Sequence, residues 1–139
     1  MRRAGHGEPV VLVHVSASDL FTWDDQREVL GERFRTIAYS RRYHWPNARI
    51  ANGANYAMAD DVDELEALLP VLNAAPAHLA GHSYGAFICL LLTIQAPRLV
   101  RKLVLIEPPM ITLFASIVPR PGEIIRLALA RPRTATALV

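Results

Sequence analysis

The chain has 139 residues, of which 52% are hydrophobic and 20% charged, and its net charge is only +2. This length and composition predict one globular domain with a buried core rather than a disordered chain. The basic residues are scattered and form no stripe with interleaved aromatic residues, which excludes a typical nucleic-acid-binding surface. No apolar run has the length of a membrane span or the pattern of a signal peptide, and the single cysteine, Cys89, lies in an apolar run typical of a buried side chain. We therefore expect a cytoplasmic protein without disulfides, nucleic-acid partners or membrane contact.

The first half of the chain alternates between predicted strands and a predicted helix. The β-branched run VVLVHV (10–15) follows a Gly-Glu-Pro turn signal and predicts a strand buried on both faces. Residues 23–34 (WDDQREVLGERF) have the apolar spacing of a helix. A second strand is predicted at 35–40 (RTIAYS), and the polar residues 41–47 (RRYHWPN) predict the loop that follows it.

The second half continues the alternation. The predicted elements are a helix at 59–72, a strand at 77–82 (AHLAGH), a helix at 84–97 that is apolar on nearly every face, a strand at 101–107 (RKLVLIE) and an amphipathic helix at 121–131. Three acidic residues, Asp60, Asp61 and Asp63, begin the helix at 59–72. We interpret them as a solvated helix start, because carboxylates near a helix N-terminus interact favourably with its dipole, rather than as catalytic groups.

Strands that alternate with helices over short connections predict parallel strands joined by right-handed crossovers. The predicted fold class is therefore α/β, a three-layer open parallel sheet with crossover helices. Ligand sites in such sheets lie beyond the carboxyl ends of the strands. In this chain that edge collects the loops after Val15, Ser40, His82 and Glu107.

The segment Gly81-His82-Ser83-Tyr84-Gly85 matches the pattern G-x-S-x-G between a predicted strand and a predicted helix. A serine on such a tight turn has its hydroxyl lifted clear of the sheet, and glycines on both sides give the turn the room it needs. The following helix N-terminus offers free N–H groups to a developing oxyanion. The alternative is an ordinary serine N-cap with convenient glycines.

With this motif, residues 7–118 resemble the central core of the α/β-hydrolase superfamily. The segments GEPVVLVHVSASDLFTW, RTIAYSRRYHWPN and HLAGHSYGAFICLLLTIQAPRLVRKLVLIEPP are similar to strands 3 to 6 of that family with their loops and helices. The resemblance implies a partial α/β-hydrolase core over residues 1–118, followed at 119–139 by the start of a cap-like helical region or a tail.

The resemblance also implies roles for individual residues. Ser83 would be the nucleophile, Tyr84 would supply one oxyanion-hole N–H, and the loop after His14 would supply the second from Ser16, next to Val15. His14 would be structural rather than the catalytic base. Substrates would be small-molecule esters, lactones or related carbonyl compounds, and nothing in the sequence points to a metal or another cofactor.

The chain departs from the family pattern in two places that bear on catalysis. Glycine usually follows the loop histidine, and Val15 at that position predicts either backbone strain or a misdirected oxyanion donor. All five histidines precede Ser83, whereas the catalytic base of the family follows the nucleophile. His44, in the loop after the second predicted strand, is the alternative base. The side chain of His82 should point to the other face of the sheet from Ser83. Glu107 matches the position of a minority triad acid, or alternatively caps the end of its strand.

Both ends of the chain look cut relative to the family. Four strands in the family order 4-3-5-6 would leave RTIAYS and RKLVLIE as bare edges, which predicts self-association. The two functional hypotheses are therefore an incomplete serine hydrolase, and an inert remnant or interaction module that keeps only the core scaffold.

Overall fold

The computed structural model describes residues 1–47, 49 and 55–109. The chain divides into two units, Met1–Pro109 and Met110–Val139, and all described residues belong to the first. The boundary predicted between residues 118 and 119 and the helix predicted at 121–131 lie outside the described residues.

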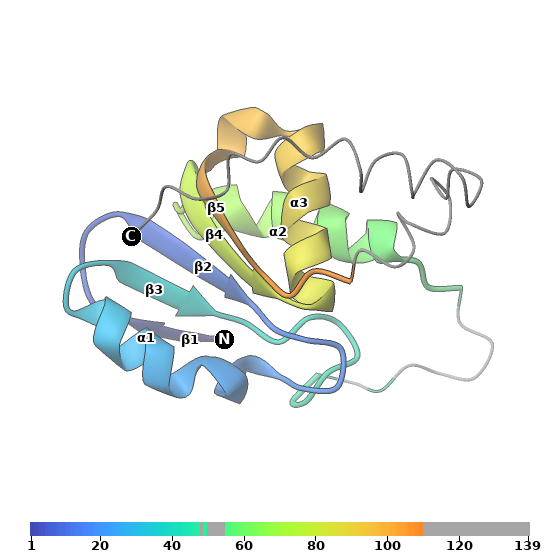
Figure 1. Cartoon of the computed structure of the whole chain (residues 1–139), viewed down its shortest axis with the longest axis horizontal. Helices are drawn as coiled ribbons and strands as arrows, with labels where there is room; N and C mark the ends of the chain where they lie inside the picture. The colour runs from blue at the N-terminus through green and yellow to red at the C-terminus, as the bar shows by residue number, and fades with distance from the viewer. Residues whose placement is uncertain (48, 50–54, 110–139) are drawn as a thin grey trace, which may run out of the picture. The chain divides into compact units, whose positions relative to one another are not determined.

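The described unit is built on a five-stranded sheet with the order β1-β3-β2-β4-β5 (Figure 1). The strands are β1 (Arg2–Ala4), β2 (Pro9–Val13), β3 (Arg35–Ala38), β4 (Ala77–His82) and β5 (Val100–Ile106). The last four are parallel to one another and have the predicted order. The α/β class and the arrangement of the four central strands are thus confirmed.

The N-terminal strand β1 corrects one part of the sequence prediction. It pairs antiparallel with β3, with Arg2 opposite Ala38 and Ala4 opposite Thr36. The sheet is therefore mixed, and β3 is not a bare edge. Because Arg2-Arg3-Ala4 has no apolar alternation of its own, its pairing depends on β3 and could not be expected from its sequence.

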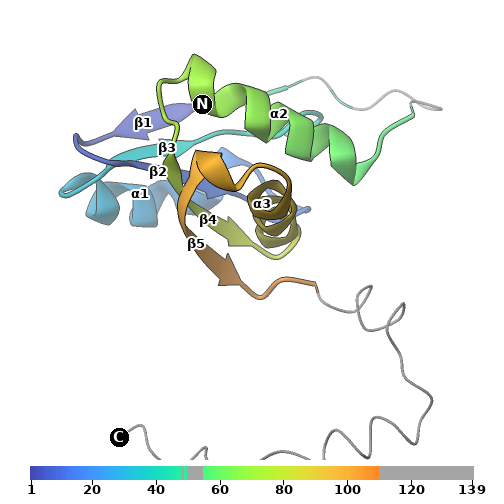
Figure 2. The same cartoon turned by 90° about the horizontal axis from the view of Figure 1, so that it is seen from above.

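Helices cover both faces of the sheet, as Figure 2 shows from above. One face carries α2 (Met58–Val71) and α3 (Tyr84–Gln95), and the other carries α1 (Asp24–Gly31) with the short 3-10 helix Leu20–Trp23 before it. Strand β2 contributes to both cores, because Val11 and Val13 face α2 and α3 while Val10 and Leu12 face α1. The three-layer prediction is confirmed.

Helix ends differ from the predicted ends by a few residues. Helix α1 ends at Gly31, three residues before the predicted end, because the N–H groups of Arg33 and Phe34 both turn back to the carbonyl of Leu30. Helix α3 buries Ala86, Cys89 and the rest of its sheet-facing side, as its apolar sequence predicts. Among the described helices, none is both long and apolar enough to span a bilayer.

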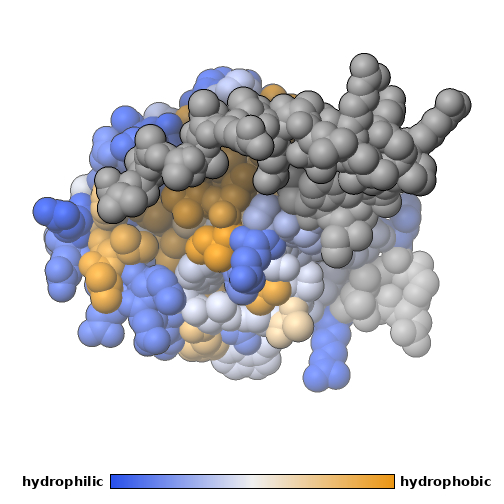
Figure 3. Space-filling view, in the orientation of Figure 1, coloured by the Kyte–Doolittle hydropathy of each residue, from blue (hydrophilic) through white to orange (hydrophobic). Residues whose placement is uncertain are grey.

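Strand β5 forms the other edge of the described sheet. Its exposed apolar side chains are Val104, Leu105 and Ile106, at 53%, 37% and 39% exposure. Figure 3 shows apolar surface gathered over the middle of one face of the molecule. The bare edge predicted for this strand is present in the described residues, and the self-association expected from it stays a prediction.

Candidate active site

Ser83 stands at the turn between β4 and α3, at the carboxyl edge of the sheet. Its φ of 53° and ψ of −118° lie in a region that residues other than glycine rarely adopt. Its N–H donates to the carbonyl of Ile106 at 2.8 Å, which ties the turn to the end of β5. Its hydroxyl caps no helix N–H and has no hydrogen-bond partner among the described residues. The alternative of an ordinary N-cap is therefore wrong, because the side chain caps no N–H of α3.

The two glycines that flank this turn are required by contacts with the backbone. A Cβ on Gly81 would lie 2.4 Å from the carbonyl oxygen of Gly85 and 2.6 Å from the Cα of Ala86. A Cβ on Gly85 would lie 2.3 Å from the carbonyl oxygen of Val13 and 2.6 Å from that of His14. Since these neighbours are main-chain atoms, no rotamer change can make room, and α3 can approach β2 and β4 this closely only with glycine at both positions.

The first N–H groups of α3 lie next to Ser83. The N–H groups of Ala86 and Phe87 donate to the Ser83 carbonyl at 3.0 and 3.2 Å. The N–H groups of Tyr84 and Gly85 have no partner among the described residues, as expected for the first residues of a helix. Together with the helix dipole, they make this end of α3 favourable for a developing negative charge.

The loop after β2 is held by buried hydrogen bonds of His14. His14 is fully buried; its Nδ1–H donates to the Val15 carbonyl at 2.8 Å, and its Nε2 accepts from the N–H of Arg41 at 3.1 Å. Burial lowers the pKa of His14 to about 4. Both ring nitrogens are therefore occupied, and the ring is neutral at pH 7, which agrees with the structural role expected of it.

Val15 does not carry the backbone strain that one alternative predicted. The described residues other than glycine that have positive φ are Tyr43, Asn73, Ser83 and Glu107, and Val15 is not one of them. The loop therefore follows a backbone path that a β-branched residue tolerates. Whether the next N–H, that of Ser16, serves as an oxyanion donor is a separate matter and stays a prediction.

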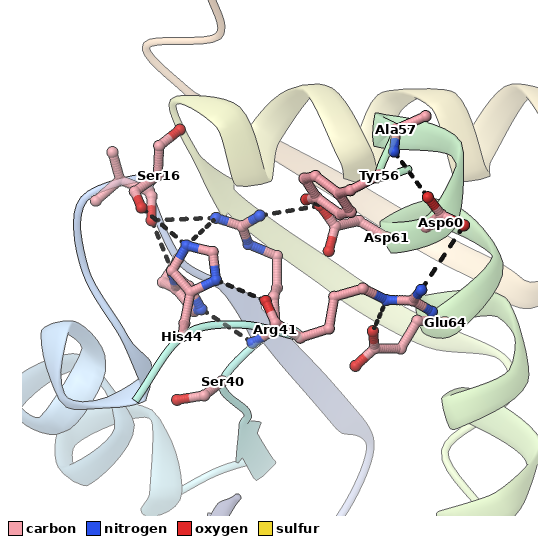
Figure 4. Close-up of polar contacts among 12 residues, drawn as sticks. Ser16, Ser40, Arg41, His44, Tyr56, Ala57, Asp60, Asp61 and Glu64 are labelled. Atoms are coloured by element: carbon pink, nitrogen blue, oxygen red, sulfur yellow. Dashed lines mark hydrogen bonds and ion pairs between the residues drawn. The ribbon is translucent and has the colours of Figure 1, made fainter. Parts of the chain in front are cut away.

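An ion pair beside this loop corrects the interpretation of Asp61. Asp61 is 1% exposed, and its Oδ2 lies 3.0 Å from Nη1 of Arg41, which is also 1% exposed (Figure 4). The hydroxyl of Tyr56 donates to the same carboxylate oxygen. Asp61 is thus not part of a solvated helix start, because the helix turns it inward toward a cation at the end of β3. Asp60 does fit the prediction, since it accepts the N–H of Ala57 at the exposed N-terminus of α2.

The sequence carries a signal for this ion pair, which the interpretation as a solvated helix start overlooked. Asp61 stands four residues before Leu65 and eight before Leu69, so it continues the buried stripe of α2. A charged residue in line with an apolar stripe needs a buried partner. Arg41 follows a buried strand and lies at the same edge of the sheet, so it is the candidate partner for Asp61.

His44 lies at the predicted edge of the sheet but is not free to act as a base. Its Nε2 lies 2.8 Å from the Ser16 carbonyl and 3.3 Å from Nη2 of Arg41, and its Nδ1 lies 2.9 Å from the Arg42 carbonyl (Figure 4). Both ring nitrogens thus face main-chain oxygens, and neither is open to the hydroxyl of Ser83. In this structure His44 fastens the loop after β2 to the loop after β3.

His82 and Glu107 pair with each other. His82 Nε2 lies 3.4 Å from a carboxylate oxygen of Glu107, which is 83% exposed and follows β5 with a φ of 48°. Along β4, His82 shares a face with Ala80, which packs on the α1 side, whereas Gly81 packs against α3. His82 therefore points to the face away from α3, as predicted, and Glu107 has His82 rather than a triad histidine as its neighbour.

Within the part of the chain that the structure describes, the histidines and acidic residues do not form a metal site. His78, at the start of β4, pairs with Glu8 at 2.8 Å, and in the described residues no three His, Cys, Asp or Glu side chains are grouped to hold a metal ion. Cys89 is buried in α3, and burial raises its pKa to about 12, so it is not a reactive thiol.

Similarity to known proteins agrees with this architecture. The model of the alpha/beta hydrolase fold family matches residues 8–128. The chain is 32% identical over 103 residues to 2-hydroxy-6-oxo-2,4-heptadienoate hydrolase of Pseudomonas putida, and the match covers 73% of this chain and 37% of that protein. It is 29% identical over 103 residues to (E)-2-((N-methylformamido)methylene)succinate hydrolase of Acinetobacter baylyi, with 74% and 38% covered.

A similar solved structure comes from work on carboxylesterases of the ammonia-oxidizing Thaumarchaeon Nitrososphaera gargenis. It matches at 30% identity and a TM-score of 0.69, over 75% of this chain and 39% of that one. The chain thus spans less than two fifths of the length of these relatives. The family model covers most of the chain, and the mostly parallel sheet with its crossover helices has the architecture of an alpha/beta hydrolase fold. This chain belongs to the alpha/beta hydrolase fold family.

Proposed function

We propose that this chain is the core of a serine hydrolase that acts on small-molecule esters, lactones or related carbonyl compounds through an acyl-enzyme on Ser83. The observation that carries the proposal is the Ser83 turn itself. A non-glycine residue is held at positive φ. Neither its hydroxyl nor the two helix N–H groups beside it have a hydrogen-bond partner among the described residues. Strain of this kind persists only where the surrounding structure enforces it, and it is often found at functional sites.

In the proposed reaction a base takes the proton of the Ser83 hydroxyl as its Oγ attacks the substrate carbonyl carbon, and the carbonyl oxygen becomes an oxyanion. The N–H of Tyr84 at the start of α3 and the N–H of Ser16 in the loop after β2 bind this oxygen. Collapse of the intermediate breaks the bond to the leaving group, which receives the proton from the base. Water, deprotonated by the same base, then attacks the acyl group, releases it as the acid and restores the Ser83 hydroxyl. Two relatives are named as hydrolases of an oxo-dienoate and of a substituted succinate, which supports a carbonyl substrate.

The base of this reaction would be a histidine outside these 139 residues, in further chain of the same protein or in a partner. None of the five histidines follows Ser83, and the ring nitrogens of His14 and His44 are occupied. Glu107 is assigned as the acid, because its carboxylate at the end of β5 is 83% exposed and can exchange its 3.4 Å contact with His82 for one with an incoming imidazole. The chain alone is therefore expected to acylate slowly and to turn over little.

A second candidate function is an interaction scaffold without catalysis, which the exposed apolar residues of β5 favour. An edge strand with Val104, Leu105 and Ile106 exposed can pair with a further strand. Under this alternative the chain should self-associate in light scattering at high concentration, and a clean monomer would count against the exposed-edge argument.

A fluorophosphonate probe tests the proposal directly. We expect stoichiometric labelling of the folded protein during a long incubation, located at Ser83 by mass spectrometry and absent in Ser83→Ala. Ser18→Ala is the matched control and should label like the wild type, because Ser18 lies in the same loop as Ser16 but bonds locally to Thr22. Folded protein that stays unlabelled, or labelling that survives in Ser83→Ala, would refute the serine hydrolase proposal.

A further inference from the structure

Arg41 is a buried cation that contacts both segments proposed to bind the oxyanion. Its Nη1 lies 3.0 Å from Asp61, and its Nη2 donates to the Val15 carbonyl at 3.3 Å (Figure 4). Its guanidinium carbon also lies 4.9 Å from the centre of the Tyr84 ring. One planar group therefore connects α2, the loop after β2 and the first residue of α3.

A gain in folding stability does not explain why this ion pair is buried. Nε of Arg41 and Oδ1 of Asp61 are buried without a hydrogen-bond partner among the described residues. Removing two charges from water is costly, and an apolar pair of similar volume is often as stable as a buried ion pair or more so. What the arginine offers beyond an apolar residue is directed hydrogen bonding to a main-chain oxygen.

The main-chain oxygen that Arg41 holds belongs to the peptide unit whose N–H is that of Ser16. In a trans peptide the C=O and N–H point in opposite directions within one plane, and the described cis bonds lie elsewhere, before Pro46 and Pro76. Holding the Val15 oxygen therefore fixes the direction of the Ser16 N–H. His14 donates to the same oxygen at 2.8 Å, so this oxygen has two donors.

A neighbouring contact fixes the next peptide unit in the same way. In the tautomer with hydrogen on Nε2, His44 donates to the Ser16 carbonyl at 2.8 Å, and Arg41 Nη2, at 3.3 Å from the same nitrogen, is then a packing neighbour rather than a donor to it. The loop after β2 therefore has two successive carbonyls bound on the side of Arg41. These bonds can replace the glycine that the family resemblance implies at this point, because they orient the peptide that follows Val15.

We propose that Arg41 is a positioning residue that orients the Ser16 N–H relative to the N–H of Tyr84. Arg41 does not touch the substrate; it acts by binding the Val15 carbonyl and by lying over the Tyr84 ring. The inference rests on the proposed function, because an orientation of this kind matters only if the two N–H groups serve the Ser83 reaction. It adds to that function a residue on which the second oxyanion donor depends.

The test separates this role from that of a structural ion pair. In Arg41→Met/Asp61→Leu both charges are replaced together, so no buried charge is left alone, and the melting temperature should stay near the wild-type value. The fluorophosphonate labelling rate should nevertheless fall about 10-fold or more; it should stay within the about 100-fold cost of losing one oxyanion donor, because His14 still donates to the Val15 carbonyl. The matched control is Arg42→Met/Glu64→Leu. It removes the neighbouring arginine and its partner Glu64, which lies 2.8 Å away and stands on α2 like Asp61, and it should label at the wild-type rate.

A double variant that labels at the wild-type rate would overturn the inference. If the double variant does not fold, the labelling rate of Arg41→Lys is measured instead. The lysine charge can stay with Asp61, but it cannot bind the Val15 carbonyl and stack on the Tyr84 ring at once. A wild-type labelling rate in Arg41→Lys would also overturn the inference.

A second measurement distinguishes failure of this inference from failure of the proposed function. Amide order parameters of residues 15–17 should drop from about 0.85 toward about 0.6 in the double variant and stay high in the control. Unchanged order parameters in the double variant overturn the inference whatever the labelling shows. Absence of labelling in the wild type overturns the proposed function, and the inference with it.

Discussion

The buried His14 should make the stability of the fold depend on pH in a way that one substitution removes. Its ring is fully buried, with Nδ1–H donating to the Val15 carbonyl and Nε2 accepting the N–H of Arg41. A proton on Nε2 would turn this acceptor into a donor that faces another donor. Burial and this arrangement favour the neutral ring, and the pKa of His14 falls to about 4.

The size and sign of the effect follow from the two pKa values. In the unfolded chain the histidine takes up a proton as the pH falls through its ordinary pKa of about 6.5, whereas in the folded protein it stays neutral until about pH 4. The contribution of His14 to the free energy of unfolding is thus complete above pH 6.5 and is lost as the pH falls from 6.5 to 4. The loss reaches about 2 kcal/mol at pH 5 and about 3 kcal/mol at pH 4.

Urea denaturation at pH 7.5 and pH 5.0 measures this loss. His14→Gln is the informative variant, because a glutamine oxygen can accept the N–H of Arg41 and does not titrate. It should be less stable than the wild type at pH 7.5, but its further loss between pH 7.5 and pH 5.0 should be smaller by about 2 kcal/mol. His6→Gln, at an exposed histidine, is the control and should keep the wild-type pH dependence.

One result would refute the reasoning. If His14→Gln loses as much stability between pH 7.5 and pH 5.0 as the wild type, the loss comes from other groups. His14 would then not be held neutral by its burial.

Three further predictions concern the Ser83 turn and the core. Ser83→Gly should raise the free energy of unfolding by about 1 kcal/mol, because glycine tolerates positive φ, while it abolishes fluorophosphonate labelling; an unchanged or lower stability would contradict strain at this residue. Gly85→Ala should destabilise the protein by about 1–3 kcal/mol in chemical denaturation, despite alanine's helix propensity, because its Cβ would lie 2.3 Å from a main-chain oxygen. Gly31→Ala, where the nearest atom is a side-chain carbon at 3.2 Å, should change stability by less than about 1 kcal/mol, and equal losses at both glycines would argue against the steric explanation. Cys89 should react with a thiol reagent at pH 8 only after denaturation, since it is buried and its pKa is raised to about 12; rapid stoichiometric reaction of the native protein would show that α3 does not bury it.

The sequence by itself determined the elements that depend on local patterns. The β-branched run in β2, the alternation of strands and helices and the glycines around Ser83 are each read within a few neighbouring residues. Because right-handed crossovers restrict the possible topologies, these local patterns were enough to predict four parallel strands with the carboxyl edge as the candidate site. The strained φ of Ser83 and the close packing of Gly81 and Gly85 follow from the same segment.

Only the tertiary structure decided which distant residues meet. The pairing of β1 with β3 joins segments about 34 residues apart and is not encoded in the pattern of either one alone. Arg41 meets Asp61, 20 residues away, and the Val15 carbonyl, 26 residues away, because the carboxyl ends of β2 and β3 and the start of α2 converge at one edge. A charge in sequence shows neither its burial nor its partner. Asp61, predicted with Asp60 and Asp63 to be part of a solvated helix start, is in fact half of a buried ion pair beside the candidate site.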